Sequence, residues 1–69
     1  MTAMVWCPFP NKAVARTIAA SLLDERLIGC ANILGEMESM FEWDGERGEA
    51  QETGVLFKCD ARQLDKVVD

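Results

Sequence analysis

The sequence contains no histidine, and this absence excludes whole classes of active site. Without an imidazole base, neither the Ser/His nor the Cys/His nucleophile pair can form. The three cysteines, Cys7, Cys30 and Cys59, are odd in number and widely spaced, which matches neither a disulfide framework nor the Cys-x-x-Cys pair of a zinc site. The five glycines fit neither the dinucleotide-binding nor the P-loop spacing. The sequence therefore predicts no catalytic motif.

Long apolar runs and basic charge are also scarce. No stretch reaches the ~18 apolar residues of a membrane span, and the N-terminus lacks the basic start of a secretory signal. We therefore expect a cytoplasmic protein with no membrane partner. Seven basic residues stand against twelve acidic ones, and no basic patch of the kind that binds nucleic acid is visible. The acidic excess favours either divalent cations or a soluble acidic surface.

What remains is an ordinary globular composition in a very short chain. Hydrophobic residues make up 49% and charged residues 28% of the sequence, which excludes a disordered tail. The 69 residues form a single domain, near the lower size limit at which a hydrophobic core is stable by itself. We therefore expect further stabilisation from a disulfide, a metal ion or self-association.

The first part of the chain predicts a strand followed by a helix. The apolar run at residues 3–7 is typical of a buried strand, which the two prolines of Pro8-Phe9-Pro10 should end. Asn11 is a good N-cap, and from residue 12 to residue 26 apolar side chains recur at helical spacing. The last turn of this helix carries a basic residue, and Gly29 lies just past its end.

The second part predicts a long hairpin. Between residues 31 and 43 apolar side chains alternate with mostly acidic ones, which is typical of a half-buried strand with one apolar face. Gly35 within this strand indicates a bulge or bend, and Asp44-Gly45 is a strong signal for a two-residue turn. The return strand ends in the apolar run 55–57, where both faces should be covered.

A second helix is predicted from residue 61 to residue 69. Asp60 can cap it, with Gln63 three residues on as the partner in a capping box. The chain then stops without a C-cap signal, so we expect that a C-terminal part is missing.

The predicted order is strand, helix, strand, strand, helix, which indicates an α+β fold. A right-handed crossover makes the first two strands parallel, and the hairpin partner then lies between them. This is the split βαβ sandwich of the ferredoxin-like group, here with a long hairpin. Its fourth strand, which should lie beside the first, is absent. Both helices would cover one face of the sheet, so another copy of the chain is the simplest cover for the other face.

Several segments together resemble the CutA1 family of divalent-cation tolerance proteins. The spacing between them needs no insertion, and the resemblance covers nearly the whole chain. The segments are Cys7-Pro8-Phe9-Pro10-Asn11 with Ala13-Val14-Ala15, Leu27-Ile28-Gly29-Cys30-Ala31-Asn32-Ile33, Ser39-Met40-Phe41-Glu42-Trp43-Asp44-Gly45, and Val55-Leu56-Phe57-Lys58.

The resemblance implies a non-enzymatic homotrimer that binds copper or another divalent cation and takes part in metal tolerance. It also implies kinship with PII-type signalling trimers, so a module that binds a small molecule or a protein at subunit clefts is the alternative. Family members continue beyond the second helix to a histidine-containing segment and further strands. Of the family's proposed copper ligands, only the cysteine that ends the first strand has a counterpart here, at Cys7.

Cys7 and Cys30 are the candidate metal ligands. A thiolate suits soft ions such as Cu(I), and Cys7 ends a strand beside a loop, where partial exposure is expected; a cysteine that merely fills space is the alternative. An unbroken hairpin register would place Cys30 opposite Cys59, whereas a bulge at Gly35 would separate them. Because Cys7 lies at the other end of the sheet, no three-cysteine site is expected within one chain.

The hairpin carries two further groups of candidate residues. Phe41 and Trp43 near its tip could line a ligand pocket, but exposed aromatics there more often pack against a partner subunit. Its carboxylates could bind hard cations, or they form a solvated strand face, which is the interpretation we favour. These carboxylates belong to Glu36, Glu38, Glu42, Glu49 and Glu52.

Overall fold

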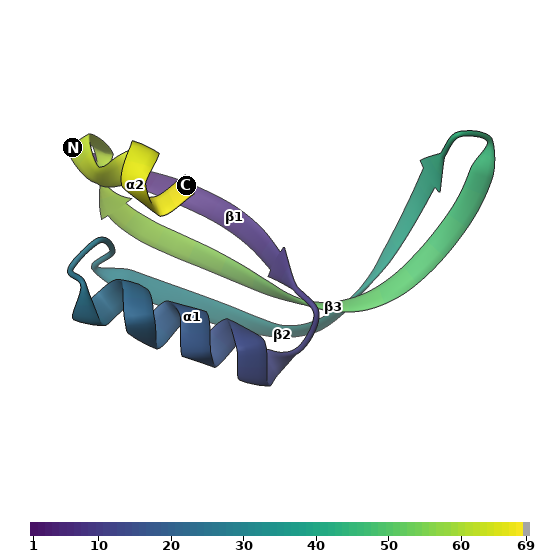
Figure 1. The fold of residues 1–69 in the computed structure, drawn as a ribbon, viewed down its shortest axis with the longest axis horizontal. Coiled ribbons are helices and arrows are strands. Elements are labelled where there is room, and N and C mark those ends of the chain that lie inside the picture. The colour runs from purple at the N-terminus through teal and green to yellow at the C-terminus, as the bar shows by residue number, and fades with distance from the viewer. Residues whose placement is uncertain (69) are drawn as a thin grey trace.

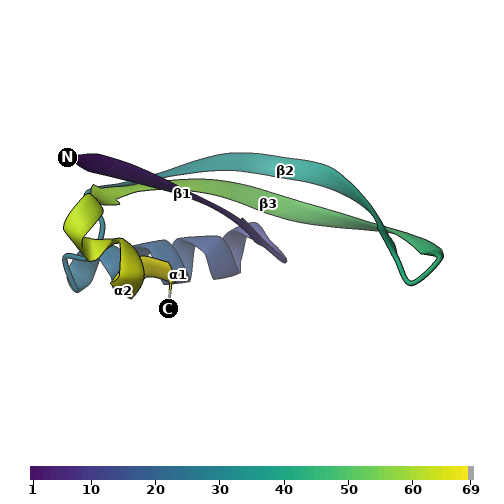
Figure 2. The ribbon, with the colours of Figure 1, turned by 90° about the horizontal axis from the view of Figure 1, so that it is seen from above.

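The computed structural model describes residues 1–68 and has the predicted α+β architecture. The three strands form one antiparallel sheet in the order β1-β3-β2, so the parallel strands β1 and β2 flank β3 as a split βαβ unit requires. Both helices lie on the same side of the sheet (Figure 2), and the hairpin of β2 and β3 extends well beyond them (Figure 1). The elements are β1 (Thr2–Phe9), α1 (Lys12–Asp24), β2 (Cys30–Trp43), β3 (Glu46–Asp60), the 3-10 turn η1 (Ala61–Gln63) and α2 (Leu64–Val68).

β1 continues through Pro8, where the sequence predicted its end. The amide of Ala61 donates to the carbonyl oxygen of Met1 at 2.8 Å, in the same antiparallel register that pairs Thr2 with Asp60. Residues along such a ladder alternate between facing the partner strand and facing away. Odd-numbered β1 residues therefore direct their backbone groups toward β3, and even-numbered ones direct theirs outward. The nitrogen of Pro8 faces outward, so the missing N–H costs the sheet no hydrogen bond.

α1 starts as predicted and packs closely on the sheet. The Asn11 side chain accepts a hydrogen bond from the amide of Val14 at 2.8 Å, as an N-cap should. The residues of α1 that are fully buried are Ala15 and Ala19, whose small side chains let the helix approach the strands. The larger Ile18 remains substantially exposed.

The predicted end of this helix is wrong. The helix stops at Asp24, and Arg26 adopts the left-handed conformation with φ of 59°. The amide of Leu27 reaches back to the carbonyl of Leu22 at 3.0 Å, which is the hydrogen bond that closes a Schellman motif. Arg26 thus occupies the position for which glycine is favoured, and Gly29 plays no part in the cap.

The hairpin turn and the bulge both lie where the sequence predicted them. Asp44 and Gly45 have φ values of 54° and 81°, and both signs fit the type I′ turn that matches strand twist. The register of β2 against β3 shifts between Ile33 and Glu36, and Gly35 within that shift has φ of 80°. A bulge of one residue is therefore present at Leu34-Gly35.

This bulge reverses which side chains of β2 face the helices. Ile33 pairs with Val55 on the helix side, whereas beyond the bulge Phe41 pairs with Gly48. Residues 48 and 55 of the continuous strand β3 differ in parity, so their side chains point to opposite faces. The prediction of one apolar face along residues 31–43 is therefore wrong, because the extra residue moves the apolar side chains of the outer half to the other face.

The core lies between α1 and the inner half of β3. Val55 and Phe57 are almost completely inaccessible, and the ring of Phe9 meets that of Phe57 edge to face at 6.1 Å between centroids. Apolar side chains of β1 and the start of β2 surround this centre. The buried apolar residues are Ala15, Ala19, Ile28, Val55, Phe57 and Cys59.

The segment after β3 begins as a 3-10 turn before it becomes helical. Asp60 accepts hydrogen bonds from the Arg62 amide at 2.9 Å and from its guanidinium at 3.0 and 2.9 Å, and these bonds hold the pKa of Asp60 far below its usual range. The predicted capping box with Gln63 does not form, since Arg62 takes both carboxylate oxygens and the Gln63 Oε1 atom is buried without a partner among residues 1–68. The predicted helix end at Asp69 lies outside the described residues. Within residues 1–68, no helix is long and apolar enough to cross a bilayer.

Candidate functional site

The three cysteines occupy separate places on the sheet. Cys7 pairs with Val55, and Cys59 pairs with Ala3. Both thiols point to the helix side of the sheet, but Cys59 lies four residues along β3 from the position that pairs with Cys7. Cys30 pairs with Lys58 and therefore points to the opposite face. The bulge at Gly35 causes this separation, because without it the register would place Cys30 opposite Cys59. The two candidate ligands, Cys7 and Cys30, are thus on different faces of one sheet and cannot bind one ion within a single chain.

Cys7 lies half-buried in the wall of an apolar groove between the two helices. Its thiol is 3.7 Å from the carbonyl oxygen of Pro8. The groove has a volume of about 560 Å³, and exposed Glu25 and Lys66 contribute one charge of each sign to its lining. The thiol is accessible for soft-metal chemistry, but its surroundings are mostly apolar. The apolar part of the lining includes Val5, Phe9, Ile18, Leu22, Phe57 and Val67.

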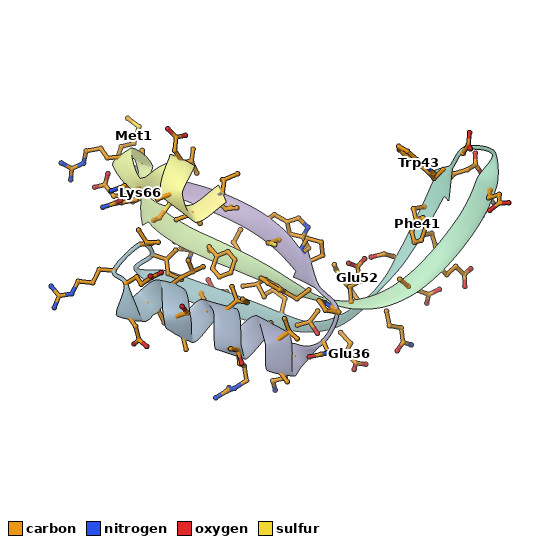
Figure 3. All side chains as sticks on the ribbon, in the orientation of Figure 1. Met1, Glu36, Phe41, Trp43, Glu52 and Lys66 are labelled. Carbon is orange, nitrogen blue, oxygen red and sulfur yellow. The ribbon has the colours of Figure 1, made fainter. Side chains whose placement is uncertain are left out.

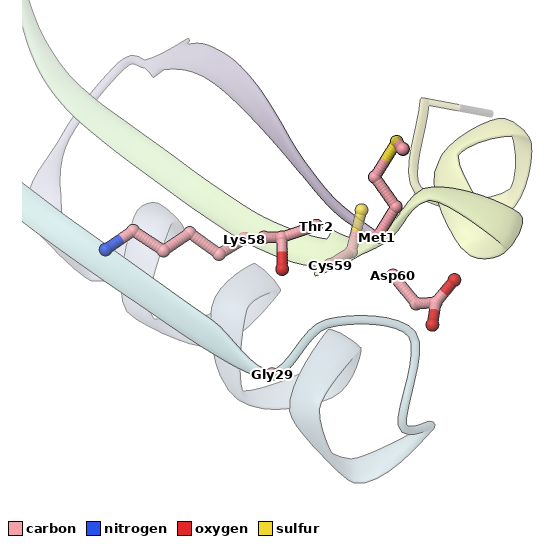
Figure 4. Close-up of a pocket in the computed structure, with 6 residues that line it drawn as sticks. All are labelled: Met1, Thr2, Gly29, Lys58, Cys59 and Asp60. Carbon is pink, nitrogen blue, oxygen red and sulfur yellow. The ribbon is translucent and has the colours of Figure 1, made fainter.

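Cys30 is half-buried on the other face, where its thiol lies 3.7 Å from the Asn32 Oδ1 atom. It is one sulfur ligand beside an amide oxygen, and its neighbour across the sheet is the cation Lys58. At the end of β3, Lys58 also borders a hollow with Cys59 and Asp60. Figure 4 shows the Lys58 and Asp60 side chains extending in opposite directions, so they do not converge on a shared ligand.

The carboxylates of the hairpin are dispersed. Glu36 and Glu52 lie near the bend of the hairpin, and Phe41 and Trp43 lie near its far end (Figure 3). Glu42 forms an exposed ion pair with Arg47 at 3.1 Å. Throughout the described part of the chain, no group of three or more Cys, Asp or Glu side chains is placed to hold a metal ion.

The sheet face that no helix covers, here called the open face, carries large apolar side chains. Met4 is 64% and Trp6 51% exposed, which corrects the prediction that the first strand is buried. On the hairpin Phe41 is 52% and Trp43 81% exposed. The side chains of the open face include those of Met4, Trp6, Cys30, Asn32, Leu56 and Lys58 on the body, and those of Met37, Ser39, Phe41, Trp43, Glu46, Ala50 and Glu52 on the hairpin.

Two aromatic rings of the open face lie against glycines. A Cβ added at Gly54 would meet the Trp6 ring, with the Cζ2 atom 3.0 Å away and Cη2 closer still. A Cβ at Gly48 would lie 2.5 Å from the Phe41 ring. Each ring thus covers a bare stretch of β3 backbone and presents its outer side to whatever contacts the open face. Sequence reasoning missed the role of Trp6, although its alternation with Val5 and Cys7 was the available signal.

Comparison with known proteins gives a clear result. The family model described as CutA1 divalent ion tolerance protein matches residues 3–69. The chain belongs to the CutA1 family. The resemblance found in the sequence motifs is thereby confirmed.

Individual CutA1 relatives support the same assignment. The divalent-cation tolerance protein CutA of Thermus thermophilus is 39% identical over 67 residues, which are 97% of this chain and 65% of the relative. The human protein CutA is 31% identical over 67 residues, covering 97% of this chain and 36% of the relative. The chain therefore spans less than two thirds of these relatives.

Solved CutA1 structures superpose closely on this chain. The structure described as the periplasmic divalent cation tolerance protein CutA from Archaeoglobus fulgidus gives a TM-score of 0.93 at 29% identity, covering all of this chain (100%) and 67% of that one. The Thermus thermophilus structure gives a TM-score of 0.92 at 38% identity, covering 99% of this chain and 66% of that one. The ferredoxin-like prediction is confirmed.

Proposed function

We propose that this chain acts in divalent-cation tolerance as a non-enzymatic homotrimer that binds copper or another divalent cation in the cytoplasm. Membership of the CutA1 family carries the proposal. The Archaeoglobus relative is described as periplasmic, so fractionation of cells that express the chain tests the compartment.

The open face supports self-association. Trp43 at 81% exposure leaves an area of roughly 200 Å² in water, and burying it would contribute on the order of 5 kcal/mol before the cost of association. Phe41 and Trp6 add to the same surface. Because the hairpin extends beyond the body of its own chain (Figure 1), its aromatics reach a neighbouring subunit, and a closed ring of three satisfies all copies equally.

Assembly also bears on the metal. One thiolate is a weak site, and Cys7 and Cys30 cannot cooperate within a chain because they lie on opposite faces of the sheet. Cys30 lies on the open face, where association brings side chains of other copies close to it. Cys7 lies in the groove between the helices. A complete site therefore needs ligands from other copies or other segments, and thiolate donors favour Cu(I) among the copper ions.

Titration with Cu(I) under reducing conditions tests this proposal. We expect uptake that falls in Cys7→Ser and in Cys30→Ser, and that stays unchanged in Cys59→Ser, the matched control, because Cys59 is only 4% exposed in the core. Mass measurement in solution gives the subunit number on the same samples. A wild-type chain that takes up no copper, or equal uptake in all three variants, would contradict the metal part of the proposal.

A PII-like module that binds a small molecule is the second candidate function, and the groove favours it. Its volume of about 560 Å³ and its apolar lining with one acidic and one basic side chain suit a small amphipathic ligand. Native mass spectrometry of gently purified protein tests this function. A constant added mass that disappears in Ile18→Arg would support it, and an unliganded mass in repeated preparations would contradict it.

A further inference from the structure

The inner stretch of β3 presents one charge of each sign on the open face. β3 pairs with β1 without interruption, and the extra residue of the bulge lies in β2, so side chains alternate regularly along β3. Glu52 and Lys58 therefore both point to the open face, the first opposite Met37 and the second opposite Cys30. Six residues of extended strand place their Cα atoms about 20 Å apart, which is too far for an ion pair within one chain.

The surface between these two charges is apolar. The Trp6 ring covers Gly54, and Leu56 follows on the same face. Glu52 and Lys58 are both half-buried, and neither forms an ion pair among residues 1–68. A second copy that covers this apolar surface also takes both charges out of water, where an unpaired charge is strongly destabilising. Association through the open face is therefore favoured where each charge meets an opposite one.

We infer that Lys58 forms an ion pair with Glu52 of the partner subunit, and that this pair sets the head-to-tail order of the copies. The inference rests on the homotrimer of the proposed function and adds the orientation of its subunits. Because the apolar stretch of β3 is acidic at one end and basic at the other, copies placed head to tail match opposite charges at every contact. Such a contact closes into a ring when its rotation permits, and in a ring no copy is left with an unpaired end.

The charges of the hairpin favour the same order. Beyond the bulge, residues 36–53 carry seven carboxylates and a single cation, Arg47, and Glu42 already binds that cation at 3.1 Å. Two hairpins placed side by side therefore repel each other, whereas a hairpin placed over the body of the next copy meets Lys58. Like charges across an interface suppress the wrong arrangement, and opposite charges fix the register of the right one. A second copy thus fits the open face best when hairpin and body alternate.

Charge reversal on the whole chain tests the inference by native mass spectrometry over a range of protein concentrations. Lys58→Glu and Glu52→Lys each place like charges at every contact, so we expect each to raise the concentration needed for assembly by at least about tenfold. The double variant restores opposite charges and should return to within about threefold of the wild type. Glu49→Lys is the matched control, because it makes the same change of charge on the other face of β3.

A zero-length cross-link on the unmodified chain keeps the test decisive if a variant fails to fold. A carbodiimide joins an amine to a carboxylate only where the two groups are in contact, so it should link Lys58 to Glu52 of the partner subunit. A mixture of isotope-labelled and unlabelled chains shows whether the linked peptide comes from two copies. The separation of about 20 Å within one chain excludes the same link inside a monomer.

The outcomes separate this inference from the proposed function. A wild type that stays monomeric would overturn the homotrimer and the inference together. Three results would overturn the inference alone in a wild type that assembles. The first is assembly unaffected by both single reversals, the second is a folded double variant that does not regain assembly, and the third is the absence of a link between positions 58 and 52 of different copies.

Discussion

Replacement of Gly54 with alanine should displace the Trp6 ring from the sheet. Gly54 is buried in the middle of β3, and the Trp6 indole covers its Cα. A Cβ at this position would lie 3.0 Å from the Cζ2 atom and closer to Cη2, which is well inside van der Waals contact. Gly54 lies within strand β3, opposite Pro8 of β1 and the bulge of β2, and the indole is a movable side chain, so we expect the indole to move.

The expected cost follows from the area that the indole now covers. Trp6 is 51% exposed, so roughly 120 Å² of a ~250 Å² side chain is buried. Losing all of that contact would cost about 3 kcal/mol at ~25 cal/mol per Å². The indole can retain part of its contact, and alanine lowers the entropy of the unfolded chain by about 0.4–1 kcal/mol relative to glycine. We therefore expect a net loss of ~1–2 kcal/mol in the free energy of unfolding.

Urea unfolding at one fixed protein concentration measures this loss, and tryptophan fluorescence in a Trp43→Phe background reports on Trp6 alone. Gly29→Ala is the matched control, because a Cβ there meets only the Lys58 carbonyl oxygen at 4.0 Å. We expect a change within ~0.5 kcal/mol for that variant. The emission of Trp6 should shift to longer wavelength in Gly54→Ala and stay unchanged in the control.

A double-mutant cycle separates the steric cause from any other. If the clash with the indole explains the loss, Gly54→Ala should cost far less in a Trp6→Ala background. Equal costs in both backgrounds would refute the steric explanation. So would a Gly54→Ala variant with the stability and the emission spectrum of the wild type.

Three other predictions concern the cap, a charge and the assembly. Arg26→Gly should raise stability by about 0.5–1 kcal/mol in thermal unfolding, because φ of 59° suits glycine; an unchanged melting temperature would contradict a strained cap. Since Arg62 holds the pKa of Asp60 far below its usual range, the resulting stability is fully present above about pH 4 and is lost as pH falls further. Asp60→Asn should therefore melt below the wild type at pH 7 and approach it at acid pH, and a gap independent of pH would exclude this ionic contribution. Joint Phe41→Ser and Trp43→Ser substitution should reduce the subunit number in light scattering without loss of secondary structure, and an intact assembly would show that the hairpin tips do not hold it.

Features that depend on a few neighbouring residues could be predicted from the sequence. The cap at Asn11, the turn at Asp44-Gly45 and the bulge at Gly35 all lie where local backbone chemistry placed them. The strand and helix order was also predictable, because apolar periodicity changes clearly between segments. From these pieces the split βαβ topology followed by the handedness of the crossover.

Features that depend on the position of one backbone group could not be predicted. Arg26 ends α1 in a conformation usually taken by glycine, and an arginine at that position gives no indication of such a conformation. Pro8 is tolerated in β1 because its nitrogen faces outward, which depends on the register rather than on the residue. Capping at Asp60 was predicted, but the choice of Arg62 over Gln63 as its partner depends on side-chain competition.

The candidate site shows the same limit. Whether Cys30 lies beside Cys59 or on the other face depends on whether one extra residue stands between Ile33 and Glu36. The sequence indicated the bulge, but the prediction of one apolar face along residues 31–43 did not take the resulting change of face into account. The open face was expected because both predicted helices cover the other face of the sheet, whereas the contact of Trp6 with Gly54 depends on the three-dimensional structure.

The bulge at Gly35 also makes β2 a strand of two independent halves. Up to Ile33 the odd-numbered positions face the helices, and from Glu36 onward the even-numbered positions do. A gain or loss of one residue at this place would leave each half in its own environment, because the ladder there already tolerates a mismatch. The same length change elsewhere in β2 would exchange the inward-facing and outward-facing side chains of one segment. Length variation among homologous hairpins should therefore concentrate at this position, and an alignment forced through it without a gap would compare inward-facing residues with outward-facing ones.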